Sequence, residues 1–137
     1  MLTNTLKEFI KAYDQLWHDI RDEHEKHCFI KKYDSSEYIL ILESLVNKKI
    51  FQLNAFEILL HIAPEKALDL LKRRYLSLDL LNNAKDHVAD LDIMFSDIKD
   101  ILGEDKLDEI LNCPEFLPTN KKNPRVIDAI NFSKDND

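Results

Sequence analysis

The chain of 137 residues is poor in the residues that build loops and cross-links: it has one glycine, four prolines and two cysteines. A single glycine excludes the usual glycine-rich loops that hold phosphate groups. Two cysteines are too few for a disulfide framework, and no apolar run is long enough to cross a membrane. The first residues, MLTNTLKEF, lack the basic start and apolar core of a signal peptide. We therefore expect a cytoplasmic protein that does not enter a membrane.

Catalytic signatures are missing as well. The sequence contains no Gly-x-Ser-x-Gly, HExxH, CxxC or EF-hand pattern. Acidic residues outnumber basic ones by 26 to 19, and the resulting net charge of −7 disfavours non-specific binding to nucleic acid. We therefore expect no catalytic residue, no cofactor, no metal and no nucleic-acid partner.

Helix-forming residues dominate what is there. Hydrophobic residues make up 45% of the chain and charged residues 33%, with abundant Leu, Ile, Lys, Asp and Glu. This composition predicts an all-α fold, a compact multi-helix domain over residues 1–137. Residues 113–137 are expected to be less regular, with a short last helix that begins at Asn123-Pro124. An apolar stripe predicts a first helix near the start of the chain: Leu6, Phe9, Ile10, Tyr13, Leu16, Trp17 and Ile20.

Capping signals predict two further helix starts. Asp34 and Glu37 have the spacing of a capping box, which favours a helix over a strand for the β-branched run that follows. Asn54 and Glu57 repeat this spacing and are expected to open the next helix, which runs to Ile62.

The stretch around this second cap, residues 54–76, reads NAFEILLHIAPEKALDLLKRRYL. It resembles a HEAT-like repeat, in which two helices with apolar stripes flank a tight turn, here with Pro64. No second copy aligns clearly with it. The resemblance therefore implies at least one HEAT-like helical hairpin within the domain, and not a regular solenoid.

Residues 84–103, AKDHVADLDIMFSDIKDILG, are the most informative stretch. Apolar residues lie on one arc of the predicted helix, and Gly103 fits a left-handed C-cap. At about 100° per residue, four further carboxylates fall within about 40° of Asp86 on a second arc: Asp90, Asp97, Asp100 and Glu104. Ile93 falls inside this row, where an apolar side chain has no obvious intramolecular use. A short second helix over residues 105–112 follows and adds Asp108.

The charge of this region indicates association. Residues 77–112 hold ten acidic and three basic side chains, so their balance of −7 equals that of the whole chain. Such a concentration of negative charge bears on what the protein associates with and not on its fold. A charged face that only keeps the protein soluble is the alternative. The functional interpretation is a basic protein partner, with these partner-binding residues: Asp86, Asp90, Ile93, Asp97, Asp100, Glu104 and Asp108.

Most histidines lie between positions 18 and 27. His24, His27 and Cys28 would share one face of a helix and are zinc-ligand types, with His18 just upstream, but no clear fourth ligand is present and exposed histidines are the commoner explanation. Arg21 and His27, separated by five residues, also resemble the Arg-x(4–6)-His motif of HEPN ribonucleases. That resemblance implies a helical enzyme that cleaves RNA with these two residues, although the motif lies early in this chain instead of late.

The chain as a whole, being small, acidic, helical and without a catalytic motif, resembles bacterial immunity proteins that neutralise secreted toxin nucleases, some of which are HEAT-like. The resemblance implies a non-enzymatic inhibitor that covers the active site of a basic toxin. It also implies that four carboxylates meet the Lys and Arg residues of the toxin: Asp86, Asp90, Asp97 and Asp100. A non-catalytic scaffold or regulatory module is the remaining alternative.

Overall fold

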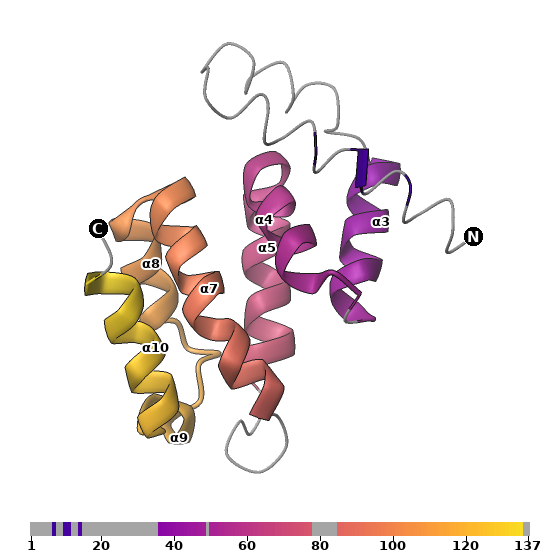
Figure 1. Ribbon diagram of the computed structural model, residues 1–137. Coiled ribbons are helices and arrows are strands. Elements are labelled where there is room, and N and C mark those ends of the chain that lie inside the picture. Colours follow the sequence, from indigo (N-terminus) through magenta and orange to yellow (C-terminus); the bar gives the residue numbers. More distant parts are fainter. Residues whose placement is uncertain are drawn as a thin grey trace. The chain divides into compact units, whose positions relative to one another are not determined.

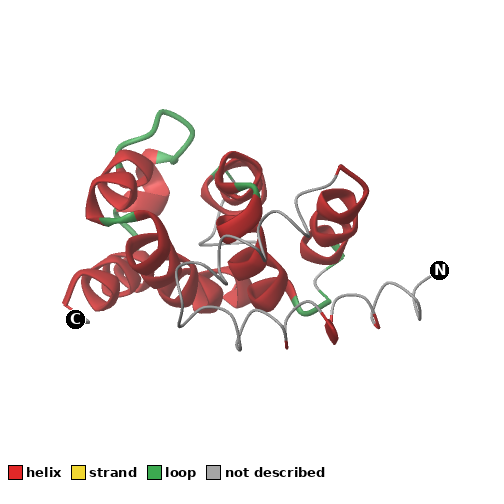
Figure 2. Cartoon of the chain, turned by 90° about the horizontal axis from the view of Figure 1, so that it is seen from above, coloured by secondary structure: helices red, strands yellow, loops and turns green. Residues whose placement is uncertain are grey.

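The protein is all-α. The computed structural model describes Lys7, Ile10, Lys11, Asp14 and residues 36–48, 50–77 and 85–135, with only the backbone described for residues 85–89 and 135. Every regular element within these ranges is a helix, as Figure 2 shows by colour. None of the described helices combines the length and the apolar character that crossing a bilayer requires.

The chain divides into two compact units, Met1–Pro64 and Glu65–Asp137. The predicted single domain over residues 1–137 stays a prediction. The predicted first helix falls mostly outside the described residues. Ile10, the member of its apolar stripe that is described, is helical but about half exposed.

The first unit contains helix α3 (Ser36–Asn47) packed against helix α4 (Gln52–Ile62). The buried side chains of α3 recur at intervals of three and four residues: Tyr38, Leu42, Leu45 and Val46. This spacing produces one apolar helical face, so the helix predicted for the β-branched run is confirmed and a strand is excluded. Leu40 lies on the opposite face and is 64% exposed.

The predicted start of α4 at Asn54 is wrong. The helix begins at Gln52, and its N-cap is Phe51, which has φ 51° and ψ 38° and makes no side-chain capping hydrogen bond. The carbonyl of Phe51 accepts a hydrogen bond of 2.9 Å from the Ala55 N–H, so the first helical turn is already closed two residues before the predicted position. The helix is therefore preceded by a residue in the left-handed conformation, Phe51, and not by the predicted capping box.

Helix α5 (Pro64–Leu71) follows α4 after Ala63, and Pro64 occupies its first position, where no N–H is needed. It continues into a single π-helical turn, η1 (Lys72–Leu76), in which Tyr75 and Leu76 are buried. The two helices and the proline turn predicted for residues 54–76 are thus present. Their pairing as a HEAT-like hairpin stays a prediction.

The second unit is built around helix α7 (Lys85–Leu102), which packs against α8 (Glu104–Leu111) and α10 (Pro124–Asp135), as Figure 1 shows. Four apolar residues of α7 are fully buried: Leu91, Met94, Phe95 and Ile98. These residues belong to the apolar arc predicted from the sequence, so the direction in which α7 faces its core is confirmed.

The segment after α8 is attached to the end of η1. Leu76 is the last residue of η1, and its carbonyl accepts hydrogen bonds from the Leu117 N–H at 3.1 Å and from Asn120 Nδ2 at 3.0 Å. Asn120 lies in the short helix α9 (Pro118–Lys121) and is 1% exposed, while Phe116 is buried. These two donors satisfy a helix-terminal carbonyl that would otherwise lack a partner, so a proline-containing stretch is held in a defined position.

Helix α10 begins at Pro124, as predicted, and runs to Asp135. The side chain of Asn123 is buried, and its Oδ1 accepts a hydrogen bond of 3.0 Å from the Arg125 N–H. Asn123 therefore caps the start of the helix and fixes where α10 leaves the short connection from α9.

Candidate protein-binding surface

Gly103 divides the predicted row of carboxylates between two helices. Its φ of 102° and ψ of 162° stop α7 at Leu102, and α8 begins with Glu104. The positive φ was expected, but the extended ψ differs from the predicted left-handed cap. The projection that placed Glu104 on the same straight helix as Asp86 is therefore wrong, because Glu104 and Asp108 belong to α8.

Asp86 and Asp90 are the first two carboxylates of the predicted row. Asp86 lies in α7, and its side chain is outside the described part of the structure. Asp90 is partly buried, and its Oδ2 accepts a hydrogen bond of 3.4 Å from the hydroxyl of Tyr75. Burial, then the negative charge of Asp90, then this hydrogen bond raise the pKa of Tyr75 well above its ordinary range. Asp90 thus serves the packing of the second unit.

Ile93 is an apolar residue on the outside of α7, with 43% of its surface exposed. At about 100° per residue, Asp100 lies within about 20° of it, two helical turns further on. The four buried apolar residues of α7 lie on the other side of the helix. The structure therefore places Ile93 on the solvent side, as the sequence predicted.

The two aspartates beyond Ile93 have different surroundings. Asp97 is partly buried and already interacts within the protein. Asp100 is exposed and makes no ion pair with a described residue. It lies in the last turn of α7, where the negative end of the helix dipole repels a carboxylate. Among the described residues, no ion pair offsets this repulsion.

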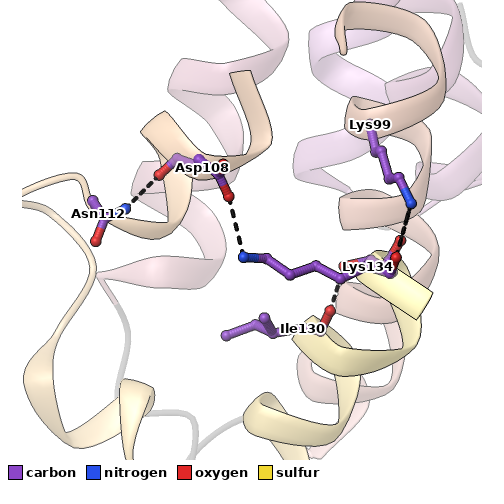
Figure 3. A network of polar contacts seen from close by, with 6 residues as sticks. Lys99, Asp108, Asn112, Ile130 and Lys134 are labelled. Atoms are coloured by element: carbon purple, nitrogen blue, oxygen red, sulfur yellow. Dashed lines mark hydrogen bonds and ion pairs between the residues drawn. The ribbon is translucent and has the colours of Figure 1, made fainter. Parts of the chain in front are cut away.

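The acidic residues at the start of α8 have a structural explanation. Glu104 and Asp105 are exposed and occupy its first turn, where the helix dipole favours negative charge. Asp108 lies one turn after Glu104, and residues four apart share a helix face. Its Oδ1 forms an ion pair of 3.2 Å with Lys134 Nζ of α10 (Figure 3).

Two lysines that the sequence did not single out organise this end of the unit. Lys99 Nζ donates hydrogen bonds to the backbone carbonyls of Ser133 at 3.3 Å and Lys134 at 3.0 Å, at the C-terminal end of α10. A lysine at this position satisfies terminal carbonyls and complements the helix dipole. The sequence signal was the single base of the last turn of α7, Lys99, in a stretch of the chain that is otherwise rich in acidic residues.

The sequence also suggested a metal site and an RNA-cleaving site. His18, Arg21, His24, His27 and Cys28 are outside the described residues. Within the described ranges, no group of three or more His, Cys, Asp or Glu side chains could hold a metal ion. The described second unit exposes apolar side chains on two helices, Ile93 on α7 and Ile127 and Phe132 on α10. Ile93 is the one that shares a helix face with a carboxylate of the predicted row.

Comparisons with family models, with curated proteins and with solved structures find no match to the chain. The resemblances to HEAT-like repeats and HEPN ribonucleases thus rest on short sequence patterns, and the resemblance to immunity proteins rests on the overall character of the chain.

Proposed function

We propose that this chain is a protein-binding inhibitor, an immunity protein that neutralises a basic toxin such as a nuclease by covering its active site. The supporting observation is the exposure of Ile93 and Asp100 along one line of α7, with Glu104 exposed at the start of α8. We call these three residues the acidic surface. An apolar side chain with polar residues around it matches the anchor-and-rim pattern of protein interfaces.

The position of Asp100 supports a role in binding. A carboxylate in the last turn of a helix costs about 0.3–1 kcal/mol through the helix dipole, and no ion pair with a described residue offsets this cost. Residues that break a local rule without a gain for the fold are found preferentially at functional sites. The solubility alternative offers no reason for placing a charge at this end of α7.

A basic partner follows from the sign of the charge. A nuclease cleft must be positive to bind the phosphates of its substrate. The acidic surface would attract such a cleft, raise the association rate and pair its carboxylates with Lys and Arg residues that otherwise contact nucleic acid. Inhibition would take place in the cytoplasm, without chemistry and without a cofactor.

The proposal is tested by inhibition. A gene for a toxin with a nuclease domain is expected immediately upstream, and the purified chain should abolish the activity of that domain when added in equimolar amount. The same titration with Ile93→Lys is the matched test, because an exposed position tolerates lysine while the apolar anchor is lost. Full nuclease activity in the presence of excess wild-type chain would contradict the proposal.

A further inference from the structure

Two lysines connect the end of α10 to its neighbours: Lys99 binds it to α7, and Lys134 binds it to α8 (Figure 3). Lys99 of α7 donates to the carbonyls of Ser133 and Lys134, and the side chain of Lys134 reaches Asp108 of α8 at 3.2 Å. Asn112 Nδ2 donates to the backbone carbonyl of Asp108 at 2.8 Å, which fixes the last turn of α8 beside this pair. Residues of α7, α10 and α8 are thus linked by consecutive polar contacts, of which the ion pair with Lys134 is the one that reaches the Asp108 carboxylate.

The ion pair between Lys134 and Asp108 is weak enough to be exchanged. The two side chains are 41% and 47% exposed, so water screens their attraction. Pairs of this kind change an equilibrium constant by no more than about fivefold. A cation brought by a partner can therefore replace Lys134 at little cost.

Asp108 lies on the same face of α8 as Glu104, one helical turn away. If it were released from Lys134, it would extend the acidic surface by one more carboxylate. We propose that Lys134 is an internal competitor for the basic partner: it occupies Asp108 in the free protein and gives it up when a partner's Lys or Arg approaches. This inference rests on the proposed function, because it assigns a regulating contact to the same surface.

Lys99 positions this competitor. Its hydrogen bonds to the carbonyls of Ser133 and Lys134 hold the last turn of α10 where Lys134 can reach Asp108. Loss of these bonds should loosen the turn and free Asp108 without removing the charge of Lys134. Lys99 is therefore a positioning residue, while Lys134 makes the competing contact.

The experiment measures binding of a peptide of nine lysines to the full chain at low salt by calorimetry. Lys134→Gln is compared with Lys122→Gln, an equal charge change at an exposed position that makes no ion pair with a described residue. We expect Lys134→Gln to raise the association constant about two- to fivefold more than Lys122→Gln does. Adding Asp108→Asn should remove this difference, and equal effects of the two lysine variants would overturn the inference.

Two further variants separate the inference from the proposed function. The double variant Asp100→Asn, Glu104→Gln should weaken peptide binding several-fold if the acidic surface is the binding site. Weakened binding together with equal effects of Lys134→Gln and Lys122→Gln would overturn only the competitor role. Unchanged binding by the double variant, or no binding by the wild-type chain, would contradict both. Exchange of the α10 amide hydrogens gives an independent readout, since exchange at Ser133 and Lys134 should rise in Lys99→Met.

Discussion

At the scale of single residues, Gly103 has the clearest requirement. Its φ of 102° and ψ of 162° belong to a region that is essentially restricted to glycine, and a Cβ atom there would meet nothing within 4 Å. Gly103→Ala is therefore expected to lower the free energy of unfolding by about 1–3 kcal/mol through backbone strain alone. Denaturant unfolding measures the change.

The same position distinguishes the observed cap from the one the sequence predicted. Asparagine tolerates the left-handed helical conformation but not an extended ψ at positive φ. Gly103→Asn should consequently destabilise the chain about as much as Gly103→Ala. Near-wild-type stability of the asparagine variant would show that residue 103 adopts the left-handed cap instead.

Ser96 offers a stabilising substitution. Its Oγ is buried in α7 and has no hydrogen-bond partner within the described ranges. Ser96→Ala removes this unsatisfied hydroxyl and adds a better helix former, so the free energy of unfolding should rise by about 1 kcal/mol. Chemical denaturation measures the rise as a higher midpoint with an unchanged m-value. A decrease in stability would mean that the hydroxyl contributes to the fold.

Glu57 on α4 gives a pH-dependent prediction. Partial burial raises the pKa of its carboxyl above the ordinary value, so the folded state holds this proton more tightly than the unfolded state. Its contribution to stability is therefore present at acid pH and is lost as the pH rises from about 4 through the folded pKa.

Glu57→Gln removes this loss, because the amide stays neutral. The variant should be more stable than the wild type at pH 7 and similar to it near pH 3. Thermal unfolding of both proteins across this range gives the comparison, since other groups cancel in the difference. A constant difference at all pH values would exclude titration of Glu57 as the cause.

At the scale of helices, the end of α10 depends on a contact from α7. Lys99→Met keeps the length of the side chain but removes its hydrogen bonds to the carbonyls of Ser133 and Lys134. The free energy of unfolding should fall by about 0.5–1.5 kcal/mol. Lys122→Met is the control, because Lys122 is exposed and makes no ion pair with a described residue. Equal stabilities of the two variants would contradict the capping role.

The helical spacing of apolar residues, together with the glycine and proline that end and begin helices, predicted the elements of the second unit well. The apolar arc of α7, the break at Gly103 and the start of α10 at Pro124 all follow from local chemistry, and the structure has them. The start of α4 was wrong because Phe51 adopts a left-handed conformation that its residue type does not favour.

The candidate site was predictable only in part. Helical spacing correctly indicated that Ile93 and Asp100 lie on the solvent side of α7. It did not indicate that Asp90 accepts from Tyr75, or that Asp108 pairs with Lys134. These partners are 15 and 26 positions away in the sequence, and they meet through the packing of helices, which no local pattern encodes.

At the scale of the whole molecule, the net charge of −7 is concentrated in residues 77–112. Internal partners at Asp90, Asp97 and Asp108 reduce the part of it that is immediately available. The acidic surface is accordingly smaller than the predicted row. Its carboxylates, Asp100 and Glu104, are exposed, so a partner can use their charge directly, and Ile93 supplies an apolar contact on the same face of α7 as Asp100.

The most direct test of this account is the association rate with the toxin nuclease as a function of salt. Asp100→Lys, Glu104→Lys is compared with Glu115→Lys, Asp128→Lys, which makes the same charge change at two other exposed positions. We predict that the first pair slows association at least tenfold at low salt and flattens its salt dependence, while the second pair has a much smaller effect. Equal slowing by both pairs would show that only net charge matters and would contradict a binding role for the acidic surface.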